Sequence, residues 1–150
     1  GAIDSVNGLA SSTFYCTSEE NTGCSSLLKP TKNLGIGVNE VIEVPTYSME
    51  HVLDQFDLKN DKAINFVKTD TQGKDFDVVK SFGKYLERIK FLHCEVSTNN
   101  QYENEQNKDD FIKYMNSRLF DVYIVSSFDH VFVNKRTMTD MSKLNIPNIP

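Results

Sequence analysis

The sequence has little cysteine and no long apolar run. Its three cysteines, Cys16, Cys24 and Cys94, are odd in number and widely spaced. This spacing argues against a disulfide framework and favours a reducing, cytoplasmic compartment. No apolar stretch approaches the roughly 20 residues that cross a bilayer, and the N-terminus lacks the basic and apolar regions of a signal peptide. We therefore expect no membrane partner.

An excess of positive charge is also lacking. The 150 residues carry 21 acidic and 16 basic side chains, well mixed, for a net charge of −5. Without a basic stripe, nucleic acid is not an expected partner. There is no CxxC or HExxH pattern, so we expect no metal centre. The P-loop and the G-x-S-x-G elbow are missing too, which disfavours the commonest nucleotide-binding and hydrolase folds.

Strand-like and helix-like segments alternate along the chain, which predicts a single α/β domain over residues 1–150. The predicted strands are 9–16, 40–44 (ended by Pro45), 63–69, 89–96, 120–126 and 129–134, the last two forming an antiparallel hairpin. The predicted helices are a short one capped by Ser48, then 74–88 and 109–119. Their apolar faces include Phe56 and Leu119. Residues 17–39 are predicted as a long surface loop and residues 136–150 as a loose tail.

The most informative stretch is Ile64–Phe76, a strand that stops at Asp70, turns at Gly73 and enters a helix. In α/β sheets, ligands bind at the carboxyl ends of the strands. A carboxylate there accepts hydrogen bonds from a ligand or acts as a base. The alternative is that Asp70 only caps the turn, with Gln72 in solvent and Gly73 supplying a positive φ. The residues alone leave both open.

Glu95 ends the next strand in the same way. If the two strands are parallel neighbours, Asp70 and Glu95 lie at one edge of the sheet and line one cleft. Alternation puts His93 on the same face as Glu95 and Cys94 on the other, so the three cannot bind one metal ion. The plainer alternatives are a core histidine, a capping glutamate and a buried, unreactive thiol.

The predicted loop holds a second candidate, the run Asn21-Thr22-Gly23-Cys24-Ser25-Ser26-Leu27. Its hydroxyls and backbone amides are suited to covering a substrate. An ordinary solvated loop is the alternative.

Residues 67–75 (VKTDTQGKD) resemble the K-I-D-x-E/Q-G-x-E signature of FkbM-type S-adenosylmethionine-dependent methyltransferases. Further matches follow in the family's order over roughly residues 1–135. They are GAID with NG and FY near the N-terminus, NTG with SSL at 21–27, VPTYSME at 44–50, the strand ending at Glu95, and DHVFVNK at 129–135. At 72 and 75, Gln and Asp stand where the family more often has Glu.

The resemblance implies a Rossmann-like class I methyltransferase sheet and O-methylation of a small-molecule or glycan acceptor. The implied cofactor is S-adenosylmethionine. Asp70 and Glu95 would be catalytic, and Asp70, Gln72 and Gly73 would contact the cofactor. Asn21, Ser25 and Ser26 would lie on the acceptor side.

One departure concerns the cofactor. The family holds it mainly by a first strand with a glycine-rich turn and by an acid ending the second strand, and no segment here fits either. We therefore expect the C-terminal part of the domain, inactive alone and completed by an N-terminal half. The strand before Asp70 would then expose Ile64 and Phe66 at a sheet edge and favour self-association. The alternative function is a non-catalytic remnant or interaction module.

Overall fold

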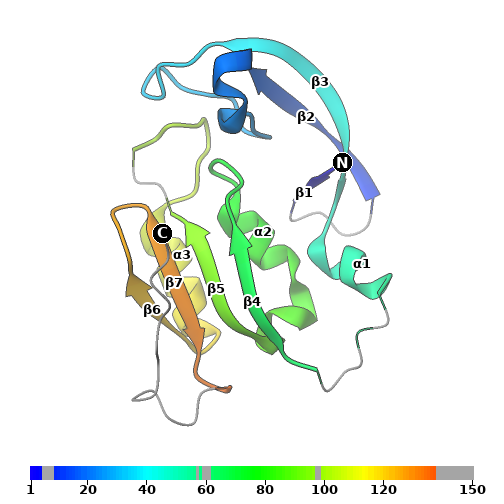
Figure 1. Cartoon of the computed structure of the whole chain (residues 1–150), viewed down its shortest axis with the longest axis vertical. Coiled ribbons are helices and arrows are strands. Elements are labelled where there is room, and N and C mark those ends of the chain that lie inside the picture. The colour runs from blue at the N-terminus through cyan, green and yellow to red at the C-terminus, as the bar shows by residue number, and fades with distance from the viewer. Residues whose placement is uncertain (5–8, 57, 59–61, 97–98, 138–150) are drawn as a thin grey trace.

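The computed structural model describes residues 1–4, 9–56, 58, 62–96 and 99–137, which form two sheets and the helices around them (Figure 1). The first sheet has the strand order β1-β3-β2, and the second has the order β4-β5-β7-β6. The strands of the first are β1 (Ala2–Ile3), β2 (Leu9–Thr17) and β3 (Val38–Tyr47). Those of the second are β4 (Ile64–Thr69), β5 (Ile89–Glu95), β6 (Phe120–Ile124) and β7 (Asp129–Asn134).

The four-stranded sheet is mixed. β4 and β5 are parallel, whereas β7 lies between β5 and β6 and is antiparallel to both. The predicted α/β class and the terminal hairpin are confirmed. In the register of the parallel pair, Thr69 lies opposite Cys94, so the next residues, Asp70 and Glu95, lie at the same edge of the sheet.

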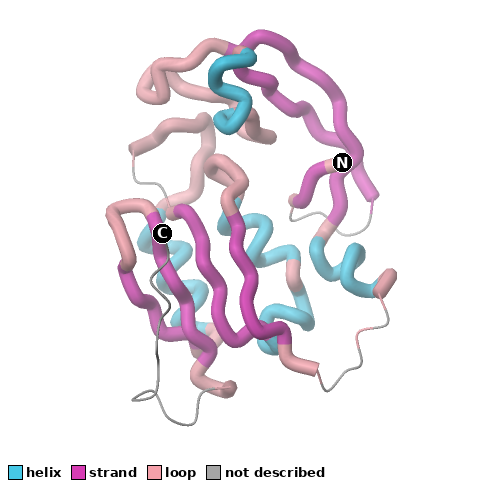
Figure 2. Tube along the Cα trace, viewed as in Figure 1, coloured by secondary structure: helices cyan, strands magenta, loops and turns pink. Residues whose placement is uncertain are grey.

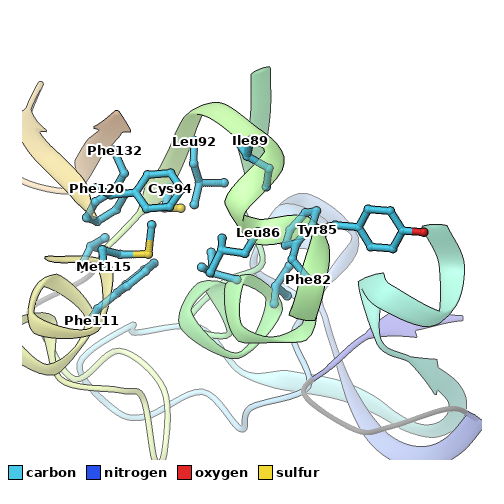
Figure 3. Close-up of a cluster of buried hydrophobic side chains, with 13 residues drawn as sticks. Phe82, Tyr85, Leu86, Ile89, Leu92, Cys94, Phe111, Met115, Phe120 and Phe132 are labelled. Carbon is cyan, nitrogen blue, oxygen red and sulfur yellow. The ribbon is translucent and has the colours of Figure 1, made fainter. Parts of the chain in front are cut away.

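Helices cover one face of this sheet (Figure 2). They are α2 (Asp75–Ser81), the 3₁₀ helix η2 (Gly83–Arg88) and α3 (Lys108–Ser117). Between them and the strands lies the core, where Val79, Leu92 and Phe132 are fully buried (Figure 3). Each such side chain contributes about 1.5–3 kcal/mol relative to exposure, so this layer fixes the strand ends that carry the candidate site.

The predicted helix after Ser48 is present as α1 (Met49–Asp54), and the Ser48 hydroxyl accepts a hydrogen bond from the His51 amide over 3.1 Å. The prediction that Phe56 belongs to its buried face is wrong, since Phe56 is 62% exposed. Because the helix ends at Asp54, position 56 lies beyond the last turn and no longer follows the helical period.

The predicted helix over 74–88 is not continuous. α2 ends at Ser81, and Gly83 opens η2 with a φ of +50°. A Cβ at Gly83 would collide with the Glu50 carboxylate of α1. The glycine therefore permits the left-handed turn, whereas the Glu50 carboxylate stands at the end of a flexible side chain that can move aside.

Leu119 was predicted to be buried on the third helix, which is wrong. α3 ends at Ser117, and Leu119 has a φ of +61° and is 46% exposed. The left-handed turn after the helix rotates this side chain away from the apolar face that Met115 occupies.

The three-stranded sheet is mainly the long antiparallel pair β2–β3, and β1 was not predicted. β3 runs through Pro45 instead of ending there. Proline is tolerated because on its β1 side β3 is paired only at Thr46 and Tyr47. The predicted loop 17–39 also contains a 3₁₀ helix, η1 (Glu19–Cys24).

Residues 138–150 of the predicted loose tail lie outside the described part of the chain. Among the described helices, none has both the length and the apolar character needed to cross a membrane.

Candidate functional site

The carboxyl ends of β4 and β5 point toward the segment that follows β2 (Figure 1). A pocket of about 270 Å³ lies where these parts meet. Four residues predicted from sequence line it: Ser25, Ser26, Asp70 and Gln72. Its other lining residues are Ala2, Ile3, Phe14, Gly23, Leu27, Thr71 and Lys74. The pocket thus combines an apolar wall with hydroxyl, amide and carboxylate groups, the usual make-up of a small-molecule site.

Asp70 and Glu95 are linked through the amide of Gln72. The Gln72 Nε2 donates to Asp70 Oδ1 over 2.8 Å and lies 3.5 Å from Glu95 Oε2. Half-burial, and next the negative charge of Asp70, raise the pKa of Glu95 to about 7. Asp70 is more exposed and lies 3.7 Å from Lys68 Nζ. The prediction that these two carboxyl groups lie at one edge of the sheet is therefore confirmed. In the structure, the charge of one carboxyl group affects the protonation of the other.

The turn after Asp70 is held from two sides. Gln72 and Gly73 have φ values of +53° and +91°, the left-handed region that the sequence predicted only for the glycine. The Ser26 hydroxyl donates to the Gln72 carbonyl oxygen over 2.7 Å. Thr71 donates its amide and its hydroxyl, each over 3.0 Å, to Asp75 Oδ2. The strained backbone of Gln72 is thus fixed by its neighbours.

Lys74 joins the two sheets and was missed by the sequence analysis. Its Nζ lies 2.8 Å from Asp4 Oδ1 and 2.6 Å from Asp77 Oδ2, and Lys80 Nζ lies 2.6 Å from Asp77 Oδ1. Burial opposes the charge of Lys74, but its two carboxylate partners outweigh that effect and raise its pKa. The i, i+3 spacing of Lys74, Asp77 and Lys80 was a usable signal for part of this cluster. No sequence pattern indicated the contact between Lys74 and Asp4.

Glu95 does not line the pocket. It lines a separate cavity of about 10 Å³ with Gly73, Asp75 and Glu105, space for about one water molecule. Oδ1 of Asp75 and Oε1 of Glu105 are buried and have no hydrogen-bond partner among the described residues. Burial raises the pKa of Asp75. The carboxyl pair therefore faces two spaces, with Asp70 toward the pocket and Glu95 toward the small cavity.

The remaining candidates lie elsewhere. Asn21 was predicted on the acceptor side but does not line the pocket. It is exposed in η1, where its Nδ2 donates a hydrogen bond to Ser18 Oγ over 3.2 Å. His93 is buried, with Nε2 lying 2.9 Å from Asp129 Oδ1, whereas its Nδ1 has no hydrogen-bond partner in the part of the chain that the structure describes. Cys94 is fully buried, and burial raises the pKa of its thiol, so the prediction of an unreactive cysteine is confirmed. In the described part of the chain, no three His, Cys, Asp or Glu side chains are grouped so that they could bind a metal ion.

Tyr102 also belongs to this region and was not singled out from sequence. It is buried, and its hydroxyl lies 2.9 Å from Gln72 Oε1. It comes from the stretch between β5 and α3, which is rich in polar residues. Tyr102 and Gln72 are 30 positions apart in sequence. A single tyrosine among polar residues does not indicate which distant residue its hydroxyl will contact.

An α/β sheet whose parallel neighbours end in a carboxyl pair beside a pocket is typical of enzymes that bind ligands at the carboxyl edge. The model of the Methyltransferase FkbM domain matches residues 3–122, and the chain belongs to this methyltransferase family. No curated protein and no solved structure matched the chain. The resemblance read from residues 67–75 is confirmed.

The residues described here do not fit the whole methyl-donor cofactor. The pocket, at about 270 Å³, is smaller than the roughly 300–1,000 Å³ typical of sites for drug-sized ligands. Gly73 offers no open backbone face, because a Cβ there would lie 3.0 Å from Tyr102 Cδ2 and 3.2 Å from Leu28 Cδ1. The space matches a small acceptor or one end of a larger ligand.

Proposed function

We propose that this protein methylates a hydroxyl oxygen of a small-molecule or glycan acceptor, using S-adenosylmethionine. The family supplies the reaction class. The observation that supports an oxygen acceptor is Asp70, a carboxylate in the pocket wall that the Gln72 amide links to Glu95, whose pKa is raised to about 7. The remainder of the cofactor site would come from residues other than those described, and contact of Asp70, Gln72 and Gly73 with the cofactor stays a prediction.

The carboxyl pair acts as one base in this proposal. Asp70 lines the pocket and accepts a hydrogen bond from the acceptor hydroxyl, which orients one oxygen lone pair for attack. S-adenosylmethionine, when bound, would supply the methyl group by breaking its S–CH3 bond and would leave as S-adenosylhomocysteine. The proton of the acceptor hydroxyl would then pass to the carboxyl pair. Glu95, whose pKa is about 7, is the member suited to hold the proton until solvent removes it.

The pocket wall recognises the acceptor. Ser25 and Ser26 provide polar lining, while Phe14 and Leu27 provide an apolar surface. The wall has no unpaired cation among the described residues, because Lys74 is held by two carboxylates. This favours a neutral acceptor over an anionic one. Asn21 takes part in the proposal only indirectly, as part of η1, which precedes Ser25.

A reducing, cytoplasmic setting is part of the proposal. It is supported by Cys16, Cys24 and Cys94, which are all free thiols.

The test is transfer of a labelled methyl group from S-adenosylmethionine to a panel of hydroxyl-bearing small molecules and glycans, using the longest natural form of the protein. Asp70→Asn and Glu95→Gln should each lower kcat by about 10²-fold or more, the usual contribution of a positioned base. Asp121→Asn, which removes the surface partner of Lys135, is the matched control and should leave kcat unchanged.

Calorimetry with S-adenosylmethionine on residues 1–150 gives a second check, with weak binding expected. Tight binding would show that these residues suffice for the cofactor and would contradict the fit described above. Full activity of both carboxyl variants would contradict the proposed base. If the full-length protein neither binds the cofactor nor transfers a methyl group, the result would favour the alternative function, a non-catalytic interaction module.

A further inference from the structure

Tyr102 is buried beneath the turn that carries the carboxyl pair, with 3% of its surface exposed. Its segment is fixed to a distant part of the chain, since Tyr102 forms a β-bridge with Pro30 and the Thr31 amide donates to the Gln101 carbonyl oxygen over 2.8 Å. Glu105 Oε2 accepts from the Gln101 amide over 2.9 Å. The ring is therefore held by its own backbone and does not depend on the turn for its place.

The Tyr102 hydroxyl has one proton and two acceptors in reach, Gln72 Oε1 at 2.9 Å and the Cys24 carbonyl oxygen at 3.0 Å. The other end of the Gln72 amide faces Asp70 and Glu95. Ionised carboxylates only accept hydrogen bonds, so the amide nitrogen must point at them and the amide oxygen at the tyrosine. The hydroxyl is the donor that favours this orientation.

We propose that Tyr102 is a positioning residue that acts through the Gln72 amide to hold the carboxyl groups of Asp70 and Glu95 in one arrangement. Its importance for catalysis rests on the proposed function, because that function makes the carboxyl pair the base. The arrangement itself does not depend on the reaction.

The charges around Glu95 explain why a neutral donor matters. Asp70 lies at the end of β4, Asp75 in α2 and Asp129 in β7, and the negative charge of each raises the pKa of Glu95, after the larger effect of burial. Burial raises the pKa of Tyr102 as well, so the phenol keeps its proton throughout the neutral range. In this acidic surrounding the Gln72 amide is the group that donates toward Glu95. Loss of its orientation should disfavour the ionised form of Glu95 further.

The test uses the variant Tyr102→Phe, which keeps the ring and removes only the hydroxyl. NMR of the Glu95 side-chain carboxyl carbon at a series of pH values gives the pH midpoint of its titration. The midpoint should rise by about 0.5 pH unit, the effect expected from one weak hydrogen bond. Tyr85→Phe is the matched control. Its hydroxyl donates to Asp54 Oδ1 over 2.7 Å, outside this cluster, so the Glu95 midpoint should stay unchanged.

Gln72→Met provides a second variant of similar length without a donor and should raise the midpoint similarly. In the double variant, Tyr102→Phe should add nothing further, because its effect passes through Gln72. An unchanged midpoint in Tyr102→Phe, or additive shifts in the double variant, would overturn the proposal. If the shifts occur but the protein transfers no methyl group, the proposed function fails and the positioning role stands. If methyl transfer is normal and the midpoint does not move, the positioning role fails alone.

Discussion

The hydroxyl of Ser26 donates to the carbonyl oxygen of Gln72 over 2.7 Å, across 46 positions of sequence. Ser26 is 1% exposed and also accepts a hydrogen bond from the Leu28 amide. This contact ties Ser26 to the turn that follows β4, so two parts of the pocket wall that are far apart in sequence are held together.

Ser26→Ala should lower the free energy of unfolding by about 1–2 kcal/mol, because it leaves a Gln72 carbonyl and a Leu28 amide without their partner. Chemical denaturation measures this. Ser117→Ala removes an exposed hydroxyl at the end of α3 and should change stability by less than about 0.5 kcal/mol. Equal losses in both variants would contradict the role given to Ser26.

Gly73→Ala should destabilise the protein by about 1–3 kcal/mol, because the backbone there has a φ of +91° and the new Cβ would lie 3.0 Å from Tyr102 Cδ2. Gly37→Ala is the matched control, since nothing lies within 4 Å of a Cβ at that position. Thermal unfolding of both variants checks the prediction. A Gly73 variant as stable as the Gly37 variant would show that the turn tolerates a side chain.

Glu95→Gln should change the pH dependence of stability. Because the pKa of Glu95 is raised from 4.5 to about 7 in the folded protein, the folded state holds a proton between these values that the unfolded chain has released. Stability therefore falls as pH rises from about 4.5 to 7. Glu95→Gln removes this slope and should be more stable than the parent at pH 8, by about 1 kcal/mol after allowing for solvent screening.

Melting curves between pH 4.5 and 8 measure this slope. Glu40→Gln, at an exposed position of β3, is the control and should leave the slope unchanged. Parallel curves for the parent and Glu95→Gln would contradict the raised pKa.

Lys74→Met should cost about 2 kcal/mol, because it removes from Asp4 and Asp77 a shared cation whose side chain is only 13% exposed. Lys29→Met breaks a surface pair with Glu103 and should cost less than about 1 kcal/mol. Urea unfolding of the two variants distinguishes them. Similar small losses would mean that Lys74 does not hold β1 to α2.

We propose that the protein self-associates through β4, which is an edge strand of its sheet in the described structure and carries Phe66 at 52% exposure. Phe66→Lys should shift sedimentation toward the monomer, because a charged side chain discourages edge pairing. Phe56→Lys, on an equally exposed phenylalanine outside the strands, should leave the distribution unchanged. A parent protein that is monomeric at all concentrations would end this proposal.

The sequence predicted what depends on local pattern. Strand endings placed Asp70 and Glu95 at one edge, and alternation placed Cys94 in the core. The breaks at Gly83 and Leu119 were missed, because each depends on a left-handed backbone that helical periodicity does not reveal. Contacts such as Lys74 with Asp4 join residues far apart in sequence, which no single-chain pattern encodes.

The bridge between Pro30 and Tyr102 has a consequence for how the chain is made. Pro30 leaves the ribosome more than 70 residues before Tyr102 does. Until then its polar backbone groups are satisfied by water, and closing so long a loop carries an entropic cost that local contacts do not offset. The support that Tyr102 gives to the turn after β4 is therefore added late in synthesis, after β2, β3 and β4 have left the ribosome.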